Sequence, residues 1–436
     1  MTPPDVSVVV AVYNTMPHLR DCLDSLIGQS IGLDRMEIVA VDDGSTDGSG
    51  EELEEFAARY PETIRVVHQA NSGGPAAPSN RALDLATGRF VYFVGADDHL
   101  AQDALRRMVA MADEYESDVV LGRMVGTNGR SVPQTVYAET SPDVDLYGSA
   151  LPYSLSNTKL FRRELVERLG LRFREDMPIF SDQPFTLTAF VHARRISVLA
   201  DYVCYFAVRR TDGNNITNKA DPLAQLRGGE QLIEFVAELI PPGDERDAVL
   251  ARHFGWELAK LLREEFLGFE EPVRRRICET IARMSELYLT PGVRARLNAT
   301  QRYRLALAAR GRIEALRKSL RDQQAGIHPA ILVRDGQAFC CLPGADDLPE
   351  DCTRLTGNLA GRLSAGLRLV AAWQGRNLEL AGELPLTGED ARVVAGTVHV
   401  RKAKDLRGCR RLPGLDLPPH AVPGPEGPAA SFRLLV

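Results

Sequence analysis

The sequence predicts an α/β fold with a mainly parallel sheet, followed by a helical region and a small all-β domain at the C-terminus. Three observations predict this organisation: β-branched segments alternate with amphipathic ones over residues 1–125, helical spacing continues over residues 221–326, and short alternating segments follow residue 327. Gly, Pro and Asn interrupt these last segments at the short intervals typical of a β-sandwich. The predicted divisions are residues 1–220, 221–326 and 327–436.

Length and composition predict a globular protein. With 436 residues, of which 44% are hydrophobic and 25% charged, the chain is long enough to bury a full core in two or three domains. It has no long apolar run of the kind that spans a membrane, and its first residues lack the basic region of a signal peptide. These features predict a cytoplasmic protein. Seven cysteines without a CxxC motif favour neither a disulfide framework nor a structural zinc site.

Charge is unevenly distributed along the chain. The formal net charge of −7 argues against nucleic acid as a partner. Between Arg294 and Arg321, however, the chain carries nine Arg and Lys residues and a single acid, Glu314. Such a stretch is either a solvated helix face or a surface that attracts a polyanion or anionic lipid headgroups. Peripheral contact with a membrane is therefore one expectation for this segment.

Four buried strands are predicted in the first part of the chain. Each is short, β-branched and almost continuously apolar, as strands covered on both faces are. The predicted strands are Val6–Val12, Glu37–Val41, Ile64–His68 and Phe90–Val94. Residues 17–30 and 49–60, which lie between strands, carry apolar residues at helical spacing. Because strands and helices alternate, the sheet should be mainly parallel.

Polar residues follow each predicted strand. They read "YN" after the first, "DDGSTD" after the second, "NSGGPAAPSN" after the third and "GADD" after the fourth. Ligands of parallel sheets collect at these carboxyl ends. The chain lacks the GxGxxG and Walker A sequences, which excludes a dinucleotide-binding oxidoreductase and a P-loop NTPase. Taken alone, Asp97 and Asp98 either form a polar turn or deliver carboxylates to a divalent cation on a diphosphate.

In these residues the sequence resembles the family 2 glycosyltransferases, which have the GT-A fold. The segments "VSVVVAVYN", "VDDGSTDGS", "NSGGPAAPSNRAL" and "GRFVYFVGADDHL" occur in the family's order and spacing. Further on, "LSNTKLFRREL" and "SDQPFTLTAFVHA" look like the wall teichoic acid β-N-acetylglucosaminyltransferases of this family. The resemblance implies a metal-dependent inverting transferase. Its donor would be a UDP-sugar, with UDP-GlcNAc as the best candidate, and its acceptor an anionic glycopolymer of the polyol-phosphate or teichoic-acid type.

The resemblance also implies roles for individual residues. Asp182 would be the catalytic base, and Asp97 would hold Mn²⁺ or Mg²⁺ on the donor diphosphate. The residues implied in donor binding are Val12, Tyr13, Asp42, Asp43, Asn71, Gly73, Asn80, Ala96, Asp97, Arg130 and Arg209, with Arg210 as the alternative to Arg209. Three positions depart from the family pattern: Ser79, Ser181, and Gly95 in place of the first DxD acid. An aspartate restored at position 95 is expected to tighten metal binding.

Other functions remain open at this point. One is a transferase that uses another UDP-sugar, such as UDP-glucose or UDP-galactose, on a capsule or natural-product acceptor. Another is a catalytically weak member that binds glycopolymer as an assembly protein, which the glycine at position 95 slightly favours. The resemblance further implies an immunoglobulin-like C-terminal domain that holds the subunits in a homotrimer, and a place at the inner face of the cell membrane.

Overall fold

The computed structural model describes residues 3–210, 221–327, 329, 331–334 and 337–355, and the backbone of five later strands. The chain forms two compact units, residues 1–253 and residues 254–436. The division into three parts at residues 220 and 326 stays a prediction. No helix among the described residues is long and apolar enough to cross a bilayer.

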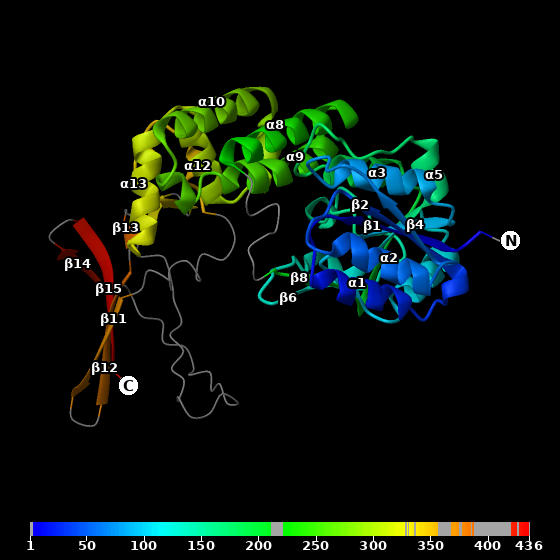
Figure 1. Ribbon diagram of the computed structural model, residues 1–436. Coiled ribbons are helices and arrows are strands. Elements are labelled where there is room, and N and C mark those ends of the chain that lie inside the picture. The colour runs from blue at the N-terminus through cyan, green and yellow to red at the C-terminus, as the bar shows by residue number, and fades with distance from the viewer. Residues whose placement is uncertain are drawn as a thin grey trace. The chain divides into compact units, whose positions relative to one another are not determined.

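The first unit is built around an eight-stranded sheet with the order β3-β2-β1-β4-β7-β6-β8-β5 (Figure 1). Neighbours among β1 to β4 are parallel, and these strands confirm the four that the sequence predicts. Their bounds are Val6–Val12 for β1, Met36–Asp42 for β2, Ile64–His68 for β3 and Phe90–Gly95 for β4. The remaining strands are β5 (His99–Leu100), β6 (Val119–Thr127), β7 (Leu160–Arg162) and β8 (Ile196–Val208). The predicted α/β class with a mostly parallel sheet is confirmed.

Helices cover both faces of this sheet (Figure 1). One core contains side chains of α1 (His18–Ile27), α2 (Ser49–Arg59) and α4 (Ala104–Glu114) together with alternate residues of the strands. In β1 these are Val6, Val8, Val10 and Val12. Val9 is equally buried, and because side chains alternate along a strand it faces the opposite side, where α3 (Ala76–Leu85) contacts β1 and β2. Burial of both faces explains the continuous apolar sequence.

The first unit contains further helices. They are α5 (Arg163–Arg168), α6 (Asp182–His192), α8 (Pro222–Leu239), α9 (Asp244–His253) and the short 3₁₀ helices η1 (Leu33–Arg35), η2 (Thr135–Tyr137) and η3 (Leu151–Tyr153). Helix α8 begins at a proline, and the Asp221 carboxylate before it accepts hydrogen bonds from the backbone of the first turn. This cap fixes where the predicted helical region begins.

The second unit begins with the rest of the predicted helical region, which is confirmed. Its helices are the π-helical η4 (Phe254–Leu258), the 3₁₀ helix η5 (Glu264–Leu267), α10 (Glu271–Tyr288), α11 (Pro291–Arg296), α12 (Ala299–Ala309) and α13 (Ile313–Gln324). Asn298 and Gln301 form a capping box at the start of α12. Each side chain there satisfies a backbone N–H that the helix leaves without a partner.

The basic stretch from Arg294 to Arg321 is largely bound to the protein itself. Arg302 is 5% exposed, and its guanidinium donates to the backbone carbonyls of Asp351 at 2.6 Å and Arg354 at 2.8 Å. Arg294 forms an ion pair with the Asp351 carboxylate at 3.4 Å. The exposed cations of the stretch are Arg296, Arg310, Lys318 and Arg321. The sequence suggested a solvated face or a polyanion-binding surface. Of the nine cations in the stretch, only these four are exposed enough for either role.

Strands follow the helices, as the sequence predicts. The strands β9 (Ile331–Arg334), β10 (Gln337–Cys340) and β13 (Leu386–Thr387) form one sheet, and the 3₁₀ helix η6 spans Glu350–Cys352. A second sheet has the order β11-β12-β15-β14, with bounds Arg368–Gln374, Asn377–Leu384, Gly427–Leu435 and His420–Gly424. The immunoglobulin-like sandwich over residues 327–436 stays a prediction, because residues 356–367 and 388–419 lie outside the described part of the chain.

Candidate active site

The candidate site lies at the carboxyl edge of the sheet in the first unit. The strand register places Val12 beside Asp42, Asp42 beside His68, and Ala11 beside Gly95. Four strands therefore end at nearly the same level, and the polar residues that follow them are brought to one edge. This edge is where ligands of parallel sheets bind.

Asp43 organises the loop that follows β3. Its side chain is buried, and its carboxylate accepts hydrogen bonds from Gln69 Nε2 at 2.6 Å and from the Ser72 hydroxyl at 2.9 Å. The Ser72 N–H donates to the same carboxylate, and the Asp43 N–H donates to the Val12 carbonyl at 2.8 Å. A nucleobase at this position would meet a carboxylate that already accepts hydrogen bonds from two residues of the loop.

Asp42 is bound on its other side by a histidine. One of its oxygens lies 2.9 Å from His68 Nδ1, and the other accepts from the Ser45 N–H at 3.0 Å. Burial opposes the charged form of Asp42, but the hydrogen bonds from Ser45 and His68 outweigh it and hold the pKa of Asp42 below its usual value. Hydrogen bonds to Asp42 and to Glu54 of α2 raise the pKa of His68. Asp42 therefore stays ionised and anchors the turn that follows β2.

Tyr13 and the loop after β3 leave open surface at this edge. Tyr13 is 51% exposed although Val12 before it is buried, so its ring offers a flat face on which a base can stack. Asn71 Oδ1 accepts from the Gly73 N–H at 2.9 Å. Gly73 has a φ of +86°, a conformation that strains other residues, and no atom lies within 4 Å of where its Cβ would be. The loop thus presents bare backbone at this edge, where a ligand could come close to it.

The two acids after β4 have different environments. Asp98 is 6% exposed, and its carboxylate accepts from the Tyr205 hydroxyl at 2.6 Å, the Val208 N–H at 2.7 Å and the Arg130 guanidinium at 3.3 Å. Burial, and secondly the charge of Asp97, raise the pKa of Asp98 to about 6. Asp97 is half-buried, and no partner of its carboxylate lies among the described residues. Asp98 therefore ties β4 to β8, while Asp97 is available to a ligand.

The glycine that replaces the first DxD acid lies in a crowded place. A Cβ on Gly95 would lie 2.9 Å from Asp98 Oδ2, 3.2 Å from Asp97 Oδ1 and 3.3 Å from the Tyr205 hydroxyl. Ala96, the next residue, is buried at 5% exposure. A side chain at position 95 would displace the network around Asp98. The structure therefore argues against the expectation that an aspartate restored at this position tightens metal binding.

Asp182 is the first residue of α6 and is half-buried. Burial raises the pKa of its carboxyl group. Hydrogen bonds from the N–H groups of Asp182 and Gln183, together with the charges of Lys159 and Arg252, oppose this rise. A carboxylate with a raised pKa accepts a proton more readily, as a general base must.

An aromatic cluster joins the start of α6 to β4. The ring of Phe185 stacks on Phe173 with a centroid distance of 4.6 Å and meets Phe93 of β4 edge-on at 5.4 Å. Phe93 also contacts Phe173 edge-on at 5.0 Å. These contacts fix the helix that begins with Asp182 against the strand that delivers Asp97.

Asn80, a predicted donor-binding residue, is bound to the chain before α6. Its Nδ2 donates to the Phe173 carbonyl and to the Glu175 carboxylate, both at 3.0 Å, and its Oδ1 accepts from the Phe173 N–H at 2.8 Å. Both polar atoms of the amide are used by these contacts. Asn80 therefore anchors the segment before α6, and the structure gives it no free group for a donor.

The predicted arginines lie at the ends of β6 and β8. Arg130 donates to Asp98 and to the Val208 carbonyl at 3.1 Å, so it supports the end of β4. Arg209 is exposed. Its neighbour Arg210 is buried and donates to the Asn14 carbonyl at 3.2 Å, next to Tyr13. Of the two alternatives, the structure brings Arg210 to the edge of β1.

Sequence reasoning missed Lys159 as a site residue. Lys159 is 1% exposed, and burial lowers its pKa to about 7, with Asp182 opposing the change. The chain has six lysines among 52 basic residues. A lysine directly before the apolar residues Leu160 and Phe161 is therefore unusual in this sequence, and this signal could have pointed to Lys159.

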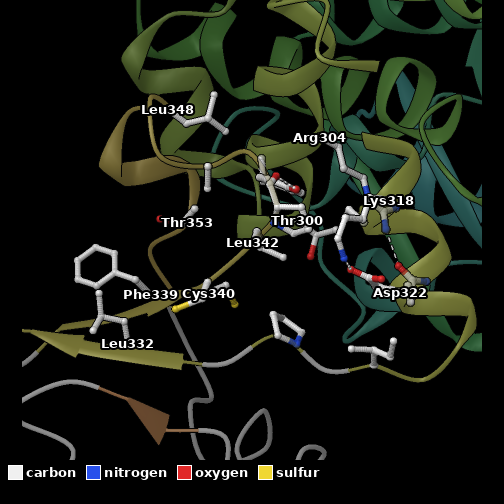
Figure 2. Close-up of a pocket in the computed structure, with 18 of the residues that line it drawn as sticks. Thr300, Arg304, Lys318, Asp322, Leu332, Phe339, Cys340, Leu342, Leu348 and Thr353 are labelled. Atoms are coloured by element: carbon white, nitrogen blue, oxygen red, sulfur yellow. Dashed lines mark hydrogen bonds and ion pairs between the residues drawn. The ribbon is translucent and has the colours of Figure 1, made fainter. Parts of the chain in front are cut away.

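The second unit contains a cavity of about 1110 Å³, which Figure 2 shows. Two pairs of its polar side chains interact with one another: Lys318 with Asp322 at 2.9 Å, and Arg304 with Gln323. None of the residues predicted for the site lines it. The candidate active site is therefore the sheet edge of the first unit.

Two protein-family models match parts of the chain. Residues 7–170, which contain β1 to β4 and the acids at their ends, match the Glycosyl transferase family 2 domain. The chain contains a family 2 glycosyltransferase domain. Residues 226–319, within the helices from α8 to α13, match the Glycosyl transferase TarS linker domain.

Two curated relatives of this chain are named as poly(ribitol-phosphate) transferases. The chain is 35% identical over 263 residues to the poly(ribitol-phosphate) beta-glucosyltransferase of Bacillus spizizenii, a match that covers 58% of this chain and 41% of the relative. It is 40% identical over 204 residues to the poly(ribitol-phosphate) beta-N-acetylglucosaminyltransferase TarS of Staphylococcus aureus, covering 47% of this chain and 35% of the relative. The chain thus spans less than half the length of these two relatives.

Solved structures of TarS have a similar fold. The crystal structure of S. aureus TarS 1–349 in complex with UDP-GlcNAc has a TM-score of 0.68 and 28% identity, covering 81% of this chain and 99% of that one. The same protein in complex with UDP gives a TM-score of 0.66 at 28% identity, covering 78% and 97%. The GT-A-like α/β fold followed by a helical region is therefore confirmed.

Proposed function

We propose that the chain is a metal-dependent inverting glycosyltransferase that moves a sugar from a UDP-sugar to a hydroxyl of a polyol-phosphate or teichoic-acid-like cell-envelope glycopolymer. One observation carries the proposal. An aromatic cluster holds the helix that begins with Asp182, a carboxyl group with a raised pKa, against β4. Asp97, a carboxylate without a described partner, follows two residues after the end of this strand. The likeness to TarS in complex with UDP-GlcNAc supports the choice of donor.

In this mechanism Asp182 acts as the general base. It removes the proton of the acceptor hydroxyl while the hydroxyl oxygen attacks the anomeric carbon of the sugar. The bond from that carbon to the diphosphate breaks in the same step, and its electron pair leaves with UDP. A single displacement of this kind inverts the configuration, and it requires no covalent intermediate on the protein.

Asp97 is proposed to hold Mn²⁺ or Mg²⁺ together with oxygens of the donor diphosphate. Its half-buried carboxylate without a described partner suits this role. No group of three His, Cys, Asp or Glu side chains in the described part of the chain is placed to hold a metal, so the diphosphate has to supply part of the ligand set, as is usual for Mg²⁺. The bound ion would stabilise the charge on the leaving diphosphate.

N-acetylglucosamine is the first candidate for the transferred sugar, and glucose is the second. The matches to TarS and to its UDP-GlcNAc complex favour the first. The longer match to the poly(ribitol-phosphate) beta-glucosyltransferase favours the second. A galactosyl donor, a capsule or natural-product acceptor, and a glycopolymer-binding assembly protein are the remaining alternatives.

A UDP-release assay tests the activity, the donor and the metal together. UDP-GlcNAc, UDP-glucose and UDP-galactose are each incubated with the protein and poly(ribitol phosphate), with and without EDTA. We expect release from one of the first two donors that depends on the polymer and stops with EDTA. Release that EDTA leaves unchanged would contradict the metal site. No release from any donor would favour the assembly protein.

The C-terminal part is proposed to hold the subunits in a homotrimer, which the strand content after residue 330 supports. The test compares light scattering of the full chain with that of a chain ending at Leu355. This end keeps the carbonyls of Asp351 and Arg354 that Arg302 binds, whereas an end at Gly326 would remove them. We expect a trimer and a monomer respectively. A monomeric full chain, or a shortened chain that stays trimeric, would contradict the assignment.

The same proposal places the enzyme in the cytoplasm at the inner face of the cell membrane, as a peripheral protein. The exposed cations of the basic stretch, Arg296, Arg310, Lys318 and Arg321, support contact with anionic surfaces.

A further inference from the structure

Lys159 lies just inside the edge of the sheet that carries the candidate site. It directly precedes β7, which pairs antiparallel with β4 through Tyr92 and Leu160. Because the two strands run in opposite directions, this register, continued by one residue, places Lys159 level with Phe93, two residues before the end of β4 at Gly95. The Lys159 ammonium donates to the Ser156 carbonyl at 2.5 Å and lies 5.7 Å from the ring centroid of Phe190. A buried cation is thus fixed behind the edge that carries the acids.

The ring of Phe190 lies on the same side of α6 as Asp182. Asp182, Thr186 and Phe190 are spaced by four residues, so they line one side of the helix. The Thr186 hydroxyl donates at 3.3 Å to the Ser156 carbonyl, which is also the acceptor of the Lys159 ammonium. The ammonium is therefore packed along the helix face at whose end Asp182 lies.

The charges around this pair are few. Burial lowers the pKa of Lys159, and among the described groups the charge of Asp182 opposes this change. Burial raises the pKa of Asp182, and the charges of Lys159 and Arg252 oppose that rise. Arg252 comes from α9 and donates to Gln183 Oε1 at 2.8 Å. No direct ion pair joins Lys159 to Asp182. The carboxylate accepts from the N–H groups of Asp182 and Gln183, and the ammonium takes none of its remaining lone pairs.

We propose that Lys159 is a positioning residue for the transfer reaction, an inference that rests on the proposed role of Asp182 as the base. Its buried ammonium keeps the Asp182 carboxylate ionised without occupying its oxygens. A lysine suits this place because its compact charge is satisfied by the carbonyl and hydroxyl of Ser156 and by an aromatic ring, whereas an arginine would bring five N–H donors in a planar fork.

The first test is the pH dependence of kcat. Lys159→Met removes the charge and keeps an unbranched side chain. Without the cation, protonation of Asp182 becomes easier, so the acid limb of the profile should move up by about one pH unit, and kcat should recover at alkaline pH. Arg168→Met, which removes an exposed cation from α5, should leave the limb in place. A Lys159→Met enzyme slowed equally at every pH would overturn the proposal.

The second test needs neither turnover nor a substitution at Lys159. Lysine labelled with ¹³C at Cε gives six NMR signals in this chain, and we expect the Lys159 signal to titrate near its lowered pKa of about 7. Coupling between two groups is reciprocal, so Asp182→Asn should lower the pKa of Lys159 further, again by about one unit. Identical titrations in both proteins would overturn the inference. A shifted titration in a protein that transfers no sugar would instead overturn the proposed function alone.

Discussion

Substitution of Asp182 by asparagine should lower kcat by about 10²-fold or more and leave the KM for the UDP-sugar nearly unchanged. Asparagine has the shape of the carboxylate but cannot accept the proton of the acceptor hydroxyl. The helix start should survive, because the ring of Phe185 fixes it against Phe93 and Phe173. Steady-state UDP release with polymer acceptor measures both constants.

The same variant predicts a change in pH dependence. Burial raises the pKa of Asp182, so wild-type kcat should fall as the pH drops through that raised pKa, because the protonated acid is no longer a base. Asp182→Asn should lack this acid limb. Asp244→Asn is the matched control, since Asp244 also begins a helix but is exposed. Turnover by Asp182→Asn within tenfold of wild type would remove this residue from the base role.

Substitution of Asp97 by alanine should lower kcat/KM for the donor by about 10²- to 10³-fold, as expected when a group that stabilises a developing charge is removed. The metal concentration for half-maximal rate should rise, because the diphosphate then has to hold the ion with fewer protein ligands. Titration of Mn²⁺ at fixed donor concentration measures this shift. A raised metal requirement distinguishes Asp97→Ala from Asp182→Asn.

An exposed acid on α1 provides the control for Asp97. Asp24→Asn removes a carboxylate from the same unit without touching the strand ends, and it should leave the metal titration unchanged. Activity that resists both EDTA and Asp97→Ala would refute the metal role. Asp98 is unsuitable as a control, because its loss would leave the Tyr205 hydroxyl and the Val208 N–H without their acceptor.

The strands and the site edge could be predicted from the sequence because their signals are local. A strand buried on both faces needs continuous β-branched residues, and β1 and β3 begin and end at the predicted residues, Val6–Val12 and Ile64–His68. The positions of Asp42 and Asp97 follow from the strands that precede them. Register then places these acids at one level, which the alternation of strands and helices already implies.

The partners of individual side chains could not be predicted, because they come from distant parts of the chain. Asn80 binds Phe173, 93 residues away, which makes it an anchor for the segment before α6. Arg302 binds carbonyls about fifty residues further on, so a stretch that looks like a basic surface is partly interior. A motif gives the residue type and the position, whereas tertiary packing decides which atoms remain free for a ligand.

The contacts of Asp98 have a consequence for synthesis of the protein. Tyr205 and Val208 lie 107 and 110 residues after Asp98, so at ordinary translation rates they follow it from the ribosome after roughly 5–20 s. Arg130 follows after only 32 residues, but the two closer donors to the carboxylate are still missing, so the end of β4 has to stay in water until they are made. A ribosome that stalls before codon 208 therefore holds a nascent chain in which Asp98, after the end of β4, cannot yet form its contacts with β8.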